Sequence, residues 1–170
     1  LQRRLVEHTL SVSADGFSQR FLWLDDGPDA ELQALAEQQG WTVVEQPAGD
    51  LGERMRCIAA LGLVESDAVM LIGNDCPAID LDYLAQARAA LVDSRAVLGP
   101  AEDGGYVLIG LRQNDSHLFS DMPWGTEQVL SLTQARLAEL DWRYELLPVL
   151  WDVDRPEDLR RLASLGMHLR

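Results

Sequence analysis

Short apolar runs alternate with amphipathic stretches along most of the chain. The apolar runs are typical of strands, and the stretches with apolar residues three and four apart are typical of helices. Strands are predicted at 20–24, 41–44, 68–72, 96–98, 106–111 and 144–150, and helices at 1–10, 29–39, 50–63, 80–91, 126–140 and after 151. This alternation over 170 residues predicts one three-layer α/β domain with a mainly parallel sheet.

The run at 68–72 is almost continuously apolar. A strand that is buried on both faces of a parallel sheet has this composition. Asp29 is expected to cap the helix that follows it, and Gly40 is expected to end that helix.

The charge balance excludes several classes of protein. The chain has 28 acidic residues against 14 basic ones, a net charge of −14, and all of its cations are Arg. A nucleic-acid backbone favours a basic surface, so a nucleic-acid binder is not expected. Without Lys there is no Schiff base and no P-loop lysine. No apolar run has the length of a membrane span, and two cysteines are too few for a disulfide framework.

The first candidate site follows the apolar run, in the segment LIGNDCP at 71–77. Ligands of open α/β sheets bind outside the carboxyl ends of the strands. Asp75 is therefore placed to hold a divalent cation that binds substrate phosphates, with Asn74 beside it. The alternative is that Asp75 only caps a turn.

A second carboxylate candidate is in WDVDRPEDL at 151–159. Asp154 and Glu157 have the spacing of a capping box around Pro156, so helix capping is the favoured role of Asp154. Asp152 has no such structural explanation and is the better candidate for a second metal ligand.

A third candidate is the glycine pair in GPAEDGGYVLIG at 99–110. Gly104 and Gly105 would let the backbone approach a ligand closely. Asp103 could bind metal, orient an acceptor hydroxyl or act as a base. An ordinary hairpin turn explains the same residues equally well.

The fourth candidate is the helix start in QPAGDLGERM at 46–55. Asp50 and Glu53 form a capping box, and Gly49 and Gly52 flank it. Free amides at this position could bind an anion, and Arg54 could clamp a phosphate.

The fifth candidate is PWGTEQVL at 123–130. Thr126 could cap the following helix. Trp124 is equally suited to be a platform for a sugar ring or a core residue. The three histidines show no metal-ligand spacing.

Taken in order, GDLGERM, LIGNDCP, GPAEDGGYVLIGL, WGTEQVL and WDVDRPEDL resemble the small bacterial glycosyltransferases of the A-type fold. That group includes the arsenosugar-biosynthesis glycosyltransferases. The segments are similar more distantly to the nucleotidyltransferases that make molybdopterin guanine dinucleotide and to phospholactate guanylyltransferase. The resemblance covers roughly residues 40 to 165.

The resemblance implies a Rossmann-like sheet, a nucleotide-sugar donor, a small-molecule acceptor and a Mg²⁺ or Mn²⁺ ion. Asp75 would bridge the metal to the donor diphosphate, Asp152 would complete the metal shell, and Asp103 would face the sugar or acceptor. One feature of the family has no match: an initial strand and a loop rich in Gly, Lys and Arg. The chain begins at Leu1, which we expect not to be a natural start. We therefore expect that residues precede it, that the sheet lacks a central strand, and that homodimers could cover the gap.

Three functions are compatible with these residues. The first is a cytoplasmic, metal-dependent glycosyltransferase. The second is a nucleotidyltransferase of the guanylyl- or cytidylyltransferase type on the same fold. The third is a non-catalytic remnant that binds a partner.

Overall fold

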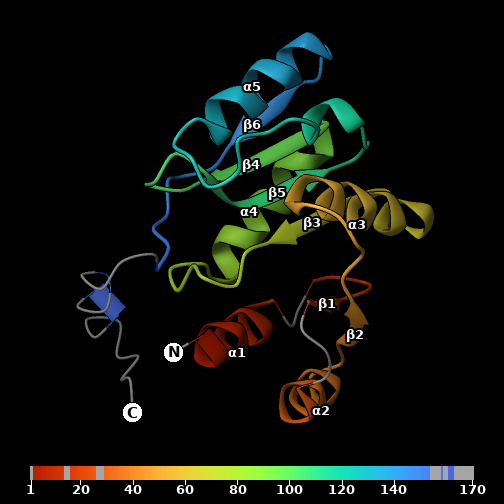
Figure 1. Cartoon of the computed structure of the whole chain (residues 1–170), viewed down its shortest axis with the longest axis vertical. Coiled ribbons are helices and arrows are strands. Elements are labelled where there is room, and N and C mark those ends of the chain that lie inside the picture. Colours follow the sequence, from red (N-terminus) through yellow and green to blue (C-terminus); the bar gives the residue numbers. More distant parts are fainter. Residues whose placement is uncertain (1, 14–15, 26–28, 154–157, 159–160, 163–170) are drawn as a thin grey trace.

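The computed structural model describes residues 2–13, 16–25, 29–153, 158 and 161–162. Helices and strands alternate along this part of the chain, as the sequence predicts (Figure 1). The helices are α1 (Gln2–Val12), α2 (Ala30–Gln38), α3 (Leu51–Glu65), α4 (Leu81–Asp93) and α5 (Val129–Glu139), with a 3₁₀ turn at Ser116–Leu118. The strands are β1 (Phe21–Leu24), β2 (Thr42–Glu45), β3 (Val69–Ile72), β4 (Ala96–Pro100), β5 (Tyr106–Leu111) and β6 (Tyr144–Leu146).

The larger sheet has the strand order β3-β5-β4-β6. Strands β3, β4 and β6 run in one direction, and β5 lies antiparallel between β3 and β4. β4 and β5 form a hairpin whose register shifts between Gly99 and Pro100. The hairpin turn proposed for residues 101–105 is therefore confirmed. The carboxyl ends of β3, β4 and β6 lie at one edge of this sheet, where a ligand crevice is expected.

Helices cover both faces of the larger sheet. Met70, Ile72 and Val97 pack in a core with α4. Leu71 and Leu98 face the opposite core, which includes α3 and Leu137 of α5. Because successive side chains of a strand point to opposite faces, this alternation produces the three predicted layers.

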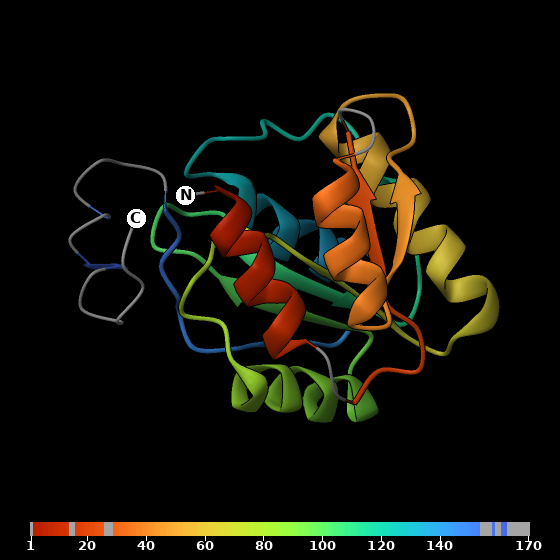
Figure 2. The same cartoon turned by 90° about the horizontal axis from the view of Figure 1, so that it is seen from below.

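The smaller sheet pairs β1 with β2 in parallel and is separate from the larger one. Its core unites Leu22 and Val43 with buried residues of α1 and α2. Figure 2 shows these two helices side by side against the small sheet. The domain therefore contains two sheets among its described residues, and not one continuous sheet.

The expectation that the run at 68–72 is buried on both faces is wrong in part. All four residues of β3 are only half-buried, whereas β4 is buried throughout. Both strands have helices against them. The difference is that β3 lies at the edge of its sheet, with β5 as its only strand partner among the described residues.

Most helix starts are as predicted. The carboxylates of Asp29 and Asp50 accept hydrogen bonds from amides of α2 and α3, and Gly40 follows α2 with φ +79°. The helix start predicted at Thr126 is wrong, because α5 begins three residues later with Gln128 at its N-cap position. The Thr126 hydroxyl still accepts a hydrogen bond from the Gln128 amide at 3.4 Å, ahead of the helix. The Asp154 capping box lies outside the described residues. No described helix is long and apolar enough to cross a bilayer.

Candidate functional site

One large cavity runs along β3 to the loop that follows its carboxyl end and extends between the two sheets. Its volume is about 1670 Å³. Eight of the predicted site residues, from five separate segments, line it. They are Arg54, Asn74, Asp75, Asp103, Gly105, Trp124, Thr126 and Asp152. Gly49, Asp50, Gly52 and Gly104 do not line it.

The two predicted metal ligands come from segments far apart in the sequence, and a backbone hydrogen bond joins these segments at this edge. The backbone N–H of Val153 donates to the carbonyl oxygen of Asp75 at 2.9 Å, which places Asp152 beside the loop after β3. Both Asp side chains belong to half-buried residues. A Cβ on Gly73 would lie 2.8 Å from Oδ1 of Asp75, so the Asp75 carboxylate turns back toward the end of β3.

The carboxylates of Asp75 and Asp152 both affect the pKa of the neighbouring Cys76 thiol. Burial raises the pKa of Cys76 to about 11, and the nearby carboxylates of Asp75 and Asp152 add to the rise. Asp75 and Asp152 therefore both lie close enough to Cys76 to act on the same thiol. No group of three His, Cys, Asp or Glu side chains in the described part of the chain could hold a metal ion. A metal at Asp75 and Asp152 would need further ligands from water or from a phosphate.

The structural role considered for the hairpin at 101–105 is confirmed, and the chemical role of Asp103 stays a prediction. The amide of Gly105 donates to Oδ1 of Asp103 at 2.8 Å, which is an Asx turn. Asp103 is exposed and also lines the cavity. Gly104 has φ +88°, and a Cβ on it would lie 2.4 Å from the carbonyl oxygen of Glu127. Glycine is therefore required at position 104 because the backbone packs closely against Glu127. The approach of a ligand is not needed to explain this glycine.

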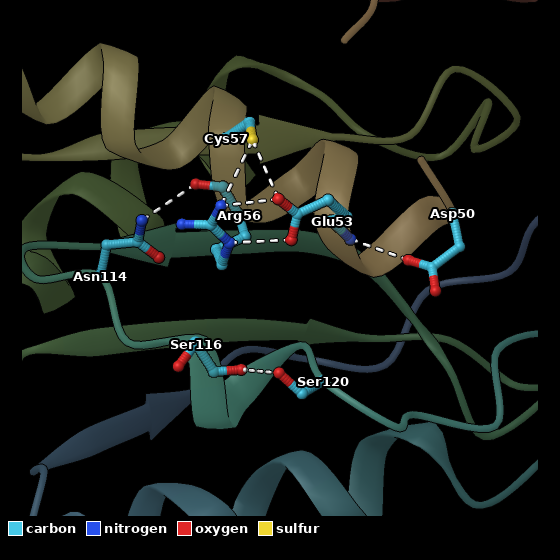
Figure 3. Close-up of polar contacts among 7 residues, drawn as sticks. All are labelled: Asp50, Glu53, Arg56, Cys57, Asn114, Ser116 and Ser120. Atoms are coloured by element: carbon cyan, nitrogen blue, oxygen red, sulfur yellow. Dashed lines mark hydrogen bonds and ion pairs between the residues drawn. The ribbon is translucent and has the colours of Figure 1, made fainter. Parts of the chain in front are cut away.

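The start of α3 is a capped helix with half of a capping box. Oδ1 of Asp50 accepts from the Glu53 amide at 2.9 Å (Figure 3). Glu53 does not return this bond, because its carboxylate binds Arg56 at 2.6 and 2.9 Å. The Arg56 guanidinium lowers the pKa of Glu53.

The Arg54 side chain binds mainly to the loop that precedes α3. Its Nε donates to the carbonyl oxygen of Gly49 at 3.0 Å, and its Nη1 donates to the side chain of Gln46 at 2.9 Å. Asp25 lies 4.0 Å away. These contacts hold the 46–49 loop against α3. The role of Arg54 in binding phosphate stays a prediction.

Trp124 serves the core and also lines the cavity. It packs edge-on to Tyr106, with ring centroids 6.4 Å apart, within the core between α3 and α5. A Cβ on Gly52 would lie 2.9 Å from Nε1 of Trp124 and 2.4 Å from the carbonyl oxygen of Phe119. Gly52 is therefore a packing glycine. Thr126 donates to the carbonyl oxygen of Pro123 at 2.8 Å, which closes the turn beside Trp124.

A further anchor of the site was not predicted. Arg161 forms two hydrogen bonds with Glu102, at 2.7 and 2.9 Å, and lies 4.5 Å over the ring of Trp151. The amide of Glu102 also donates to the carbonyl oxygen of Leu150 at 3.0 Å. The chain before Asp152 is thereby fastened to the 101–105 hairpin. Arg161 lowers the pKa of Glu102. No local pattern links residues 59 positions apart, so this contact could not be predicted from local residue types.

The chain has the nucleotidyl and sugar transferase fold, as its likeness to three solved structures shows. A crystal structure from Desulfovibrio desulfuricans G20, described as a candidate nucleotide-diphospho-sugar transferase, is similar over 99% of this chain and 85% of its own, with a TM-score of 0.81 and 24% identity. A cytidylyltransferase from Leptospira borgpetersenii serovar Hardjo-bovis (strain JB197) is similar over 98% of this chain and 77% of its own, with a TM-score of 0.66 and 16% identity. CMP:2-keto-3-deoxy-manno-octonic acid synthetase, complexed with CTP, is similar over 95% of this chain and 87% of its own, with a TM-score of 0.59 and 12% identity. At these identities the likeness shows the fold.

The chain belongs to a family described as uncharacterized protein conserved in bacteria (DUF2064), whose model matches residues 9–126. Among curated proteins it is similar to two molybdenum cofactor guanylyltransferases. The one from Shewanella frigidimarina (strain NCIMB 400) is 37% identical over 75 residues, which is 44% of this chain and 38% of that protein. The one from Shewanella amazonensis (strain ATCC BAA-1098 / SB2B) is 32% identical over 62 residues, 36% of this chain and 32% of that protein. The matches thus span about a third of the length of these relatives.

Proposed function

We propose that this protein is a metal-dependent transferase that takes its transferred group from a nucleotide donor. The observation that carries the proposal is the pairing of Asp75 and Asp152 at the carboxyl edge of the sheet, joined by the bond from Val153 to Asp75. Two carboxylates on one wall of a cavity fit Mg²⁺ or Mn²⁺, which in such sites binds few side chains and several phosphate oxygens. A bound cation of this kind would stabilise the negative charge of the departing phosphate group.

The residues of the chain itself have separate roles in this proposal. Asp75 and Asp152 hold the cation, and Asn74 and Gly105 lie in the cavity wall where a donor would rest. Trp124 offers an aromatic face beside them. Asp103 is exposed at the cavity and is the candidate for orienting the acceptor hydroxyl or taking its proton.

Glycosyl transfer from a nucleotide-diphosphate sugar is the first form of the reaction. It is supported by the similarity to the Desulfovibrio structure over 99% of the chain. Transfer of a nucleotidyl group from a nucleoside triphosphate is the second form, and the two guanylyltransferases and the cytidylyltransferase favour it to the same degree. The two forms release different products, a nucleoside diphosphate in the first and pyrophosphate in the second.

The first experiment is a binding screen of the protein with nucleoside diphosphates, nucleoside triphosphates and nucleotide sugars, each with and without Mn²⁺. A ligand at a hundred times its dissociation constant adds about 2.7 kcal/mol to the stability. For a domain of this size that raises the melting temperature by roughly 5 to 11 °C. A rise that requires metal and nucleotide together is the expected result.

The variant Asp75→Asn tests the site. We expect it to remove the metal-dependent part of the shift, because the amide cannot supply the negative charge that binds the cation. Asp93→Asn is the matched control, since Asp93 is exposed on α4 and does not line the cavity. An Asp75→Asn protein that keeps the full metal-dependent shift would overturn the metal site. The absence of any shift with every nucleotide would favour the non-catalytic remnant.

A further inference from the structure

The loop at 73–80, between β3 and α4, carries the proposed metal ligand Asp75 and is held in place by other segments. The carbonyl oxygen of Asp75 accepts a hydrogen bond from the Val153 amide at 2.9 Å. At the end of the loop, the carboxylate of Asp80 accepts from the Tyr83 amide at 2.8 Å and so caps α4. The position of Asp75 therefore depends on contacts made outside the strand that it follows.

His8 of α1 adds a contact to the 73–80 loop from a distant part of the sequence. Its Nε2 lies 3.1 Å from the carbonyl oxygen of Ile79, in a half-buried position. A carbonyl oxygen can only accept, so Nε2 carries the proton and donates it. Figure 1 shows α1 directly below this loop. The spacing of the histidines does not indicate this contact, because it joins residues 71 positions apart.

Helix α1 packs against both parts of the domain. Val6 and Leu10 belong to the core of the small sheet. Val12 packs against the core that includes Ile79, which is 0% exposed. His8 precedes Val12 by four residues and therefore lies on the same side of α1. The bond to Ile79 is thus made where α1 meets the part of the domain that carries the candidate site.

We propose that His8 is a positioning residue of the candidate site. Its Nε2–H holds the 73–80 loop at Ile79 and thereby keeps Asp75 beside the segment of Asp152. The inference rests on the metal site proposed above, and it adds a residue from α1 to that site. Helix α1 thereby couples the small sheet to the metal ligands. Loss of a hydrogen bond of this kind corresponds to a change in binding of about three- to tenfold.

Three variants of the full chain test this role. His8→Leu removes the donor and keeps a side chain of similar size. His8→Gln places an amide N–H near the position of Nε2 and should restore the bond. Ser11→Ala is the matched control, because Ser11 is exposed on the same helix and its hydroxyl bonds to the His8 carbonyl within α1. If His8→Leu does not fold, His8→Asn replaces it, since its shorter side chain stays polar but does not reach Ile79.

The first readout is hydrogen exchange of the Val153 amide without metal, because the bond of this amide to Asp75 depends on the position of the loop. His8→Leu should speed its exchange about three- to tenfold and leave β4 unchanged. His8→Gln and Ser11→Ala should exchange like the unaltered protein. The second readout is titration of nucleotide at fixed Mn²⁺. His8→Leu should weaken this binding by the same factor, and His8→Gln should restore it.

The proposal is overturned if His8→Leu leaves the exchange of Val153 unchanged, or if His8→Gln behaves like His8→Leu. An equal rise of exchange in β4 would also overturn it, because the effect would then be a general loss of stability. Absence of metal-dependent binding in the unaltered protein would overturn the metal site instead. The exchange of Val153, which needs no metal, then decides by itself whether His8 holds the loop.

Discussion

The backbone N–H of Val153 donates to the carbonyl oxygen of Asp75 at 2.9 Å. This single bond joins the segment after β6 to the loop after β3, and it brings the carboxylates of Asp75 and Asp152 to one wall of the cavity. Glu102 and Arg161 fasten the same segment from its other side. The proposed metal site is thus assembled by main-chain and side-chain contacts between parts of the chain that are far apart in sequence.

The variant Val153→Pro removes that N–H while it leaves both carboxylates in place. We expect it to weaken metal-dependent nucleotide binding about tenfold, which corresponds to 1.4 kcal/mol, because Asp152 is no longer held beside Asp75. Val153→Ala, which keeps the N–H, is the control and should bind like the unaltered protein. Titration of nucleotide at fixed Mn²⁺ measures the effect. Equal affinities for the two variants would show that the bond does not position the site.

Asp50 tests whether the start of α3 is a cap or a ligand site. Asp50→Ala should lower the free energy of unfolding by about 1 kcal/mol, because the Glu53 amide loses its acceptor. Asp50→Asn keeps an acceptor oxygen and should retain most of the stability. Urea unfolding gives both values. If Asp50→Asn unfolds as easily as Asp50→Ala, the charge and not the hydrogen bond stabilises the helix start.

Gly52→Ala separates helix propensity from packing. In an unconstrained helix, alanine stabilises by roughly 0.5–1 kcal/mol relative to glycine. Here the added Cβ would lie 2.4 Å from the carbonyl oxygen of Phe119, so we expect a loss of about 1–3 kcal/mol. The urea concentration at the midpoint of unfolding should rise if helix propensity dominates and fall if the packing clash dominates. An increase in stability would mean that the Phe119 loop moves aside freely.

The two cysteines should differ in reactivity. Cys76 is 1% exposed, and burial raises its pKa to about 11, whereas Cys57 is half-buried on α3. We expect a thiol reagent at pH 8 to modify Cys57 in the folded protein and to leave Cys76 unmodified, as mass spectrometry of peptides would show. Rapid modification of Cys76 would contradict its burial. In the control variant Cys57→Ala, Cys76 is the one cysteine left, so any modification measured is its own.

The Cys76 thiol should also make the free energy of unfolding depend on pH in the alkaline range. The pKa of Cys76 is higher in the folded state than the value of about 8.5 for a free thiol, so the folded state keeps its proton after the unfolded state has lost it. The free energy of unfolding should therefore fall as the pH rises from about 8.5 toward 11. Cys76→Ala should make this part of the pH profile flatter, and an unchanged slope would assign it to other groups.

Local features of the sequence determined most of the elements. The caps at Asp29 and Asp50, the break at Gly40 and the hairpin around Asp103 follow from hydrogen bonds between residues at most five apart. Such bonds depend only on neighbouring residue types, so a single sequence is enough to predict them. The same local chemistry placed the start of α5 three residues too early, because residues 126–128 form a turn in which the Thr126 hydroxyl donates to the Pro123 carbonyl and accepts from the Gln128 amide.

The tertiary structure alone decided how these elements are combined. The apolar run of β3 predicts a strand but cannot show that its outer edge is unpaired, because pairing depends on which other strand lies beside it. The sequence could propose Asp75 and Asp152 as separate candidates, and only the fold brought them to the same cavity. It also assigned Gly52 and Gly104 to packing, since their neighbours come from loops at 119–127. Contacts between distant segments are set by the packing of the whole chain, and no local pattern of residues encodes them.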